Sequence, residues 1–149
     1  MKIKILIPVY NDFQSVSKLL NDINFTIANL KVEFSVIIVN DASIEKQDID
    51  VSSIDKINSI KIINMKNNQG HARCIAAGLK HIFEKEEFDY VIPMDGDGED
   101  RPAEIEKFIE FLKYDNFRPI TGERIKRSEG LFFKISYSIH KLITFIFTG

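Results

Sequence analysis

The sequence predicts an α/β protein with a mainly parallel sheet and helices on both faces of that sheet. Short apolar runs rich in β-branched residues alternate with segments whose apolar residues recur at helical spacing. Polar clusters follow several of these runs, and 44% of the 149 residues are apolar, which is enough for one domain with a buried core. This alternation implies right-handed βαβ units, whose parallel strands end at one edge of the sheet.

The first half of the chain contains three predicted strands. Residues 3–9 and 34–39 are short, mainly apolar runs, which is typical of strands buried on both faces. Between them, apolar residues at helical spacing over 13–30 predict one amphipathic helix. The polar stretch 44–58 predicts a loop, with room for a short helix, before a third strand at 60–63.

The second half continues the same alternation. The turn signal at 67–70 precedes a helical pattern over 75–83, and a strand is predicted at 90–94. A second helical pattern covers 105–112, with Pro102 suited to a first helical position. A further strand is predicted at 117–122.

Composition excludes several classes of protein. The net charge of -2 argues against a general nucleic-acid binder. The single cysteine, Cys74, permits no internal disulfide and indicates a reducing, cytoplasmic compartment. The first apolar run is too short for a signal peptide, and no stretch of roughly 20 uncharged apolar residues predicts a membrane span.

Polar clusters follow three of the predicted strands, at Tyr10-Asn11-Asp12, Asn40-Asp41 and 95–100. In parallel sheets, ligands bind beyond the carboxyl ends of the strands, so these clusters predict one shared crevice.

The acidic cluster after the strand at 90–94 has two interpretations. In an extended segment, Asp95, Asp97 and Glu99 would point the same way, and a hard divalent cation would offset their repulsion. The alternative is a solvated acidic turn, with Asp100 favourably placed near the start of the next helix. An EF-hand is excluded because Asp100 occupies the position of the required glycine and a strand precedes the loop. Neither a dinucleotide-binding glycine motif nor a P-loop is present.

Four ordered blocks resemble family 2 glycosyltransferases of the Rossmann-like GT-A fold, closest to the polyprenyl-phosphate (dolichol-phosphate mannosyltransferase-like) branch. The blocks lie at 7–12, 39–43, 68–78 and 94–102. The resemblance extends from residue 3 to about 127 and implies a nucleotide-sugar-binding domain over 1–127 that is incomplete at its C-terminus. Asn40 and Ala42 depart from the family's Val-Asp-Asp-Gly-Ser block.

The resemblance also implies the roles of individual residues. Substrate-binding positions are Pro8, Tyr10, Asp12, Val39, Asp41, Asp95, Gly96, Asp97, Glu99 and Arg124. The first three would line the base and ribose pocket, and Asp41 would hydrogen-bond the base or ribose. Asp95, Asp97 and Glu99 would hold Mg²⁺ or Mn²⁺, although Glu99 stands where the family often has Gln. Asp97 and Arg124 are the implied catalytic residues, with Arg124 on the donor diphosphate.

The implied reaction is transfer of a sugar, with inversion, from a nucleotide-diphosphate sugar to an acceptor such as a polyprenyl phosphate. A divalent ion and an arginine stabilise the charge of the leaving diphosphate. No convincing general base follows Asp100, but a phosphate acceptor is already ionised. The alternative is an inactive nucleotide-sugar-binding remnant. Because family domains continue further, a partner chain or a second copy is a candidate for the missing half.

The terminal segment predicts an amphipathic helix over 128–149. An apolar stripe runs through 131–147, with Lys134, His140 and Lys141 largely on the other side. This pattern favours a helix lying in a membrane interface, which would make the protein peripheral on the cytoplasmic face of the membrane. The alternative is packing on the rest of the domain or on a second copy. We interpret His71 as a surface or capping residue near the donor and Cys74 as a packing residue.

Overall fold

The computed structural model describes residues 1–114, 119–122, 136 and 141. The chain divides into two compact units, Met1–Asn116 and Phe117–Gly149, and every helix and strand named below belongs to the first. The predicted helix at 128–149 lies almost entirely outside the described residues, so its structure stays a prediction.

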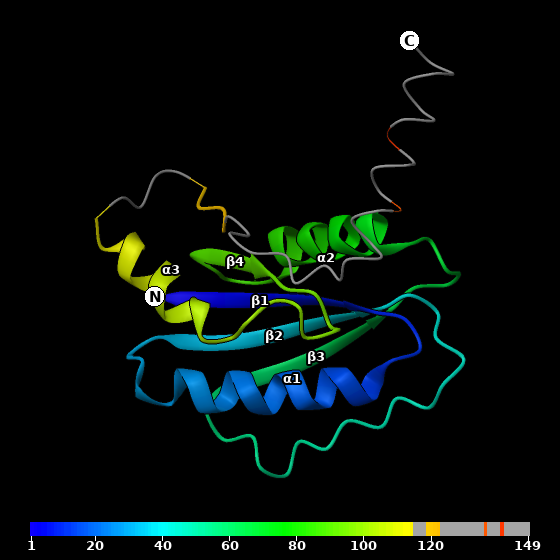
Figure 1. Cartoon of the computed structure of the whole chain (residues 1–149), viewed down its shortest axis with the longest axis horizontal. Coiled ribbons are helices and arrows are strands. Elements are labelled where there is room, and N and C mark those ends of the chain that lie inside the picture. The colour runs from blue at the N-terminus through cyan, green and yellow to red at the C-terminus, as the bar shows by residue number, and fades with distance from the viewer. Residues whose placement is uncertain (115–118, 123–135, 137–140, 142–149) are drawn as a thin grey trace. The chain divides into compact units, whose positions relative to one another are not determined.

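Four parallel strands form one sheet in the order β3-β2-β1-β4 (Figure 1). They are β1 (Lys2–Val9), β2 (Glu33–Asn40), β3 (Ile57–Asn64) and β4 (Tyr90–Pro93). β1 pairs in parallel with β2 over its whole length and with β4 from Ile3 to Leu6. The carboxyl ends of all four strands therefore lie along the same edge, as the alternation predicts.

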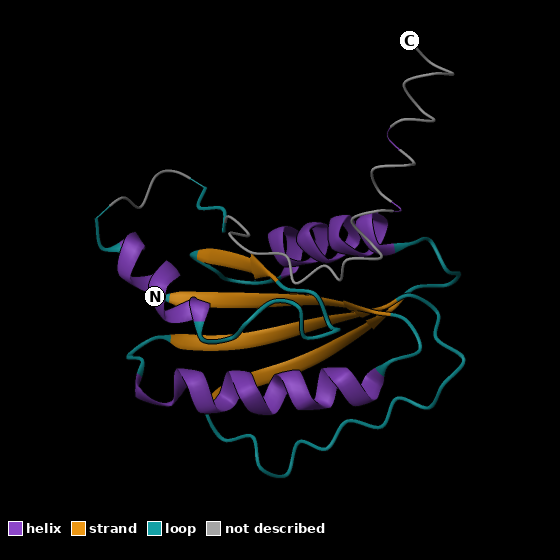
Figure 2. Cartoon of the chain, in the orientation of Figure 1, coloured by secondary structure: helices purple, strands orange, loops and turns teal. Residues whose placement is uncertain are grey.

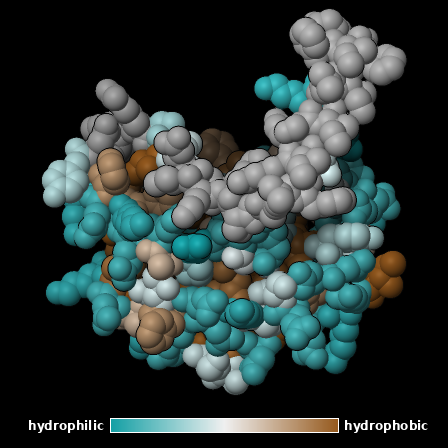
Figure 3. Space-filling view, viewed as in Figure 1, coloured by the Kyte–Doolittle hydropathy of each residue, from teal (hydrophilic) through white to brown (hydrophobic). Residues whose placement is uncertain are grey.

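Helices cover both faces of the sheet, which confirms the predicted fold class (Figure 2). They are α1 (Phe13–Thr26), extended by the 3₁₀ turn η1 (Ile27–Asn29), then α2 (His71–Lys85) and α3 (Glu104–Leu112). Residues of α1 and α3 share one core cluster with Ile3, Ile5 and Ile7 of β1. Residues of α2 pack with Leu6, on the opposite face of the same strand. The visible surface over α1 is mainly hydrophilic, as expected for an amphipathic helix (Figure 3).

Glycine at position 78 lets α2 lie close to the sheet. A Cβ at Gly78 would be 2.3 Å from Leu6 Cδ1 and 3.0 Å from Val39 Cγ2. Both neighbours are fully buried, so they have little room to move. This close packing fixes the distance between α2 and the ends of β1 and β2.

Three predicted elements differ from the structure. α3 begins at Glu104 and not at Pro102, because the carbonyls of Arg101 and Pro102 accept N–H bonds from Glu104 and Ile105, forming a separate turn. Residues 44–56 contain no helix, and β3 begins at Ile57, earlier than predicted. The described part of the predicted strand at 117–122, residues 119–122, is not in a strand.

Lys4, Glu86 and Lys61 form a charged cluster on the side of the sheet toward the amino-terminal edge, away from the carboxyl ends of the strands. Lys4 Nζ lies 2.9 Å from a Glu86 carboxylate oxygen, and both side chains are only 9% exposed. The other Glu86 oxygen accepts from Lys61. These two hydrogen bonds outweigh burial and lower the pKa of Glu86 from its ordinary 4.5 to about 2.

The Glu86 ion pairs make stability depend on pH. Because the folded-state pKa is depressed, their contribution is complete above pH 4.5 and is lost as pH falls toward about 2. We expect Glu86→Gln to lower the free energy of unfolding near pH 7 by about 2 kcal/mol, because Lys4 stays buried without its partner. The variant should also lose stability less steeply between pH 4.5 and 2. Urea denaturation across this pH range measures both effects.

Glu87→Gln is the matched control, since Glu87 is exposed and pairs with the exposed end of Lys2. It should change the stability at pH 7 far less than Glu86→Gln does. Equal effects of the two substitutions would contradict the buried ion pair.

Candidate functional site

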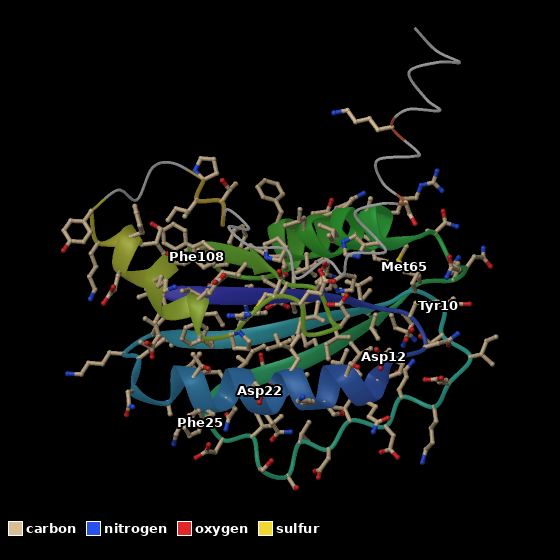
Figure 4. All side chains as sticks on the ribbon, viewed as in Figure 1. Tyr10, Asp12, Asp22, Phe25, Met65 and Phe108 are labelled. Carbon is tan, nitrogen blue, oxygen red and sulfur yellow. The ribbon has the colours of Figure 1, made fainter. Side chains whose placement is uncertain are left out.

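The polar clusters after β1, β2 and β4 meet at the carboxyl edge of the sheet, as predicted. The Asp41 N–H donates to the Val9 carbonyl at 2.8 Å, and the Met94 N–H donates to the Leu6 carbonyl at 2.9 Å. These bonds continue the pairing of β1 with both neighbours beyond the strand ends. Figure 4 shows Tyr10 and Asp12 at this end of the sheet.

The loop after β1 presents the first predicted site residues. Pro8 is buried in β1, whereas Tyr10 is 49% exposed at the strand end. Asp12 is the N-cap of α1, where its carboxylate accepts the Ser15 N–H at 3.1 Å. Tyr10 and Asp12 are therefore both accessible, and the cap fixes the position of Asp12.

Asn11 joins this loop to the loop after β2. Its N–H donates to Ser43 Oγ at 2.9 Å, and its side-chain oxygen accepts the N–H of Ile44 at 2.8 Å. Asn11 itself has a φ of 51°, a left-handed conformation that asparagine tolerates better than most residues. The two loops consequently form one connected rim.

The hydrogen bonds of Asn40 explain why asparagine stands here in place of the family's aspartate. Its amide nitrogen donates to Asn64 Oδ1 at 2.8 Å, while its amide oxygen accepts the Ser43 N–H at 3.0 Å. An ionised aspartate could accept the second bond but could not donate the first. Asparagine therefore ties the end of β2 to the end of β3.

Asp41 is buried, with 4% exposure, and its two carboxylate oxygens accept the N–H groups of Gln69 at 2.7 Å and Gly70 at 2.8 Å. Burial alone would raise the pKa of Asp41, but these two donors and the Cys74 thiol hold it below its ordinary value. Burial, together with Asp41, raises the pKa of Cys74 to about 11, which fits its predicted packing role. The predicted contact of Asp41 with a nucleoside stays a prediction, and each of its oxygens accepts one backbone N–H.

The acidic segment after β4 forms a turn, as in the second of the two interpretations, and not the extended segment of the first. A Cβ at Gly96 would lie 3.1 Å from the Pro8 carbonyl oxygen, so this glycine lets the turn rest against the end of β1. Gly98 has a φ of 82°, a conformation that glycine adopts more readily than other residues. The Glu99 N–H donates to the Asp97 carboxylate, and the Asp95 N–H donates to that of Asp100, both at 2.9 Å.

The turn does not line up three carboxylates in the expected way. Within the described residues, no group of three or more His, Cys, Asp or Glu side chains is arranged to hold a metal ion. Burial raises the pKa of Asp95, as do the neighbouring charges of Asp100, Asp97 and Glu99. His71 lowers the pKa of Asp95, because its Nε2 lies 3.4 Å from Asp95 Oδ1. The predicted Mg²⁺ or Mn²⁺ site at Asp95, Asp97 and Glu99 stays a prediction.

Comparison with known proteins identifies the family. The family model described as Glycosyl transferase family 2 matches residues 4–148, nearly the whole chain. The chain belongs to glycosyl transferase family 2.

Individual relatives align with most of this glycosyltransferase chain. An uncharacterized protein of Methanocaldococcus jannaschii is 26% identical over 93% of the chain, which spans 59% of that relative. An undecaprenyl-phosphate 4-deoxy-4-formamido-L-arabinose transferase of Pseudomonas fluorescens is 31% identical over 82% of the chain, which spans 36% of that protein. The chain therefore spans about a third to three fifths of the length of these relatives.

A solved structure supports the fold. The crystal structure of S. aureus TarS 1-349 in complex with UDP-GlcNAc matches with a TM-score of 0.57 and 20% identity, over 86% of this chain and 38% of the TarS 1-349 chain. The Rossmann-like GT-A fold expected from the sequence is confirmed.

The roles of two predicted residues of this family 2 chain, Val39 and Arg124, stay predictions. Val39 is fully buried in the core beneath α2, so its side chain does not line the edge. Arg124 lies outside the described residues. Sequence reasoning missed the bonds between Asn11 and the loop after β2. It also missed the bonds that Asp41 accepts from Gln69 and Gly70, for which the turn signal at 67–70 was a hint.

Ala42 stands at the family's glycine position with a φ of 57°. A left-handed conformation costs a non-glycine residue about 1–2 kcal/mol. We expect Ala42→Gly to raise the free energy of unfolding by up to about 1 kcal/mol, since glycine also gains entropy in the unfolded chain. Thermal and urea denaturation measure the change.

Ala76→Gly, at an exposed position inside α2, is the control for this substitution. It should lower the free energy of unfolding by about 1 kcal/mol, because helix interiors disfavour glycine. If both variants lose the same stability, Ala42 is not strained.

Proposed function

We propose that this chain binds a nucleotide-diphosphate sugar together with Mg²⁺ or Mn²⁺ at the carboxyl edge of its sheet, as the donor-binding part of an inverting glycosyltransferase. The observation that carries the proposal is the acidic turn held against the end of β1, beside the accessible Tyr10 and Asp12. Family membership supports it independently. The chemistry requires positive charge at the turn, since both the turn and the diphosphate are anionic.

The charge of the turn favours a cation. Asp95, Asp97, Glu99 and Asp100 lie within six residues, and their mutual repulsion contributes to the raised pKa of Asp95. A divalent ion that binds Asp95 and Asp97 would offset this repulsion and bridge the turn to the donor diphosphate. Arg124 is proposed to contact the same diphosphate from a part of the chain outside the described residues.

The proposed acceptor is a polyprenyl phosphate. Relatives from Erwinia tasmaniensis and Pseudomonas fluorescens are named as undecaprenyl-phosphate transferases, which supports a lipid-phosphate acceptor for this chain. Such an acceptor needs positioning more than deprotonation, because its phosphate is already ionised.

A second candidate function is nucleotide-sugar binding without turnover. A product assay with radiolabelled sugar nucleotide and polyprenyl phosphate separates the two candidates, because only an active transferase produces labelled lipid.

The metal-dependent donor site can be tested by thermal stability. UDP-, GDP- and dTDP-sugars are screened with Mn²⁺ or with EDTA, and a ligand at about 100 times its Kd should stabilise the chain by about 2.7 kcal/mol. We expect Asp97→Asn to reduce this stabilisation with Mn²⁺ and to have little effect in EDTA.

Glu84→Gln is the matched control, because it removes one exposed carboxylate near the far end of α2. It should leave the ligand-induced stabilisation unchanged. Equal binding by the parent and Asp97→Asn in Mn²⁺ would refute the role of the acidic turn.

We also propose that residues 131–147 lie in the membrane interface and bring the donor site to the lipid acceptor. Within the described part of the chain, no helix has the length and apolar character needed to cross a membrane. The full chain should float with anionic liposomes, and a variant ending at Gly130 should remain in the dense fraction. Identical behaviour of the two proteins would remove the support for membrane binding.

A further inference from the structure

We propose that Asp41 is a positioning residue that sets the start of α2, and thereby places His71 beside Asp95 of the acidic turn. Its role in donor binding would then be indirect, in contrast to the nucleoside contact expected from the family resemblance. The inference rests on the proposed function in one respect, which is that Asp95 takes part in binding the donor.

The first step is the contact between Asp41 and the turn before α2. Both carboxylate oxygens accept backbone N–H groups, from Gln69 at 2.7 Å and from Gly70 at 2.8 Å. Bonds from N–H groups to an ionised carboxylate are stronger than those between neutral groups. With only 4% of the residue exposed, Asp41 is packed inside the protein.

The second step is the conformation of the turn itself. Gly70 is the N-cap of α2 with a φ of 86°, and no side chain caps this helix. A Cβ at Gly70 would meet nothing within 4 Å, so glycine is needed here for its backbone angle and not for space. The carboxylate of Asp41 thus binds the N–H groups of Gly70, the N-cap, and of Gln69, the residue before it.

The third step connects the turn to the acidic cluster. His71 is the first residue of α2 and directly follows the anchored Gly70. Its Nε2 lies 3.4 Å from Asp95 Oδ1, and the Asp95 N–H is in turn bound to the Asp100 carboxylate at 2.9 Å. A displacement of Gly70 therefore moves the side chain that α2 places against Asp95.

This arrangement distinguishes positioning from direct contact. If Asp41 acts through His71, then removing His71 abolishes most of the effect of changing Asp41 on donor binding. If Asp41 contacts the nucleoside, the two substitutions act independently and their free-energy effects add.

The test uses the full chain with Asp41→Asn, His71→Ala and the double variant. The first readout is NMR without ligand, on the Gln69 and Gly70 amides and the His71 imidazole. Asp41→Asn should shift all three signals, because asparagine can accept only one of the two bonds. Glu84→Gln should leave these signals in place. An unchanged His71 signal in Asp41→Asn would overturn the proposal.

The second readout is calorimetric binding of UDP-GlcNAc with Mn²⁺. Asp41→Asn should weaken binding about tenfold in the parent background and less than about twofold in the His71→Ala background. Additive losses would overturn the proposal in favour of direct contact. If the parent itself does not bind, the proposed function fails for this donor, while the NMR readout still decides the positioning role.

If Asp41→Asn does not fold, Gly70→Ala replaces it in both measurements. It strains the same turn through its φ of 86° and leaves Asp41 in place. It should shift the His71 imidazole signal and weaken binding in the same way. A folded Gly70→Ala with parent His71 signals and parent affinity would contradict the connection from the turn to Asp95.

Discussion

The parallel pairing of β1 with β2 on one side and β4 on the other is the constraint on which the site depends. It brings three strand ends, and the three polar clusters that follow them, to one edge of the sheet. Nothing in local sequence would otherwise bring Tyr10, Asp41 and Asp95 together. The close approaches at Gly78 and Gly96 then fix how near α2 and the acidic turn come to β1.

The edge is held by bonds between side chains and backbone groups of different loops. Asn11, Asn40 and Asp41 each connect two segments that are distant in sequence. Among the described residues, no buried side-chain nitrogen or oxygen lacks a hydrogen-bond partner. A rim satisfied in this way is rigid, whereas the acidic turn resting on it carries mutual repulsion that a bound cation would offset.

Sequence reasoning predicts the fold well because hydrophobic periodicity reports directly on strands, helices and their buried faces. It also predicts which clusters meet, because parallel strands share an edge. It leaves the acidic segment open between an extended segment and a turn, and the structure has the turn, with Gly98 at a φ of 82°. The role of Asp41 is equally hidden, since its partners lie 28 and 29 residues away and are backbone groups, which leave no trace in residue identity.

The most direct test of the account is a crystal structure of the chain with a nucleotide sugar and Mn²⁺. We predict nucleotide density at the carboxyl edge, with the metal bound by Asp95 and Asp97 and the nucleoside near Tyr10 and Asp12. Density at the opposite edge, in the cavity of about 310 Å³ lined by Lys2, Lys4 and Glu86, would contradict it. So would a nucleotide at the carboxyl edge that makes no contact, direct or through metal, with the acidic turn.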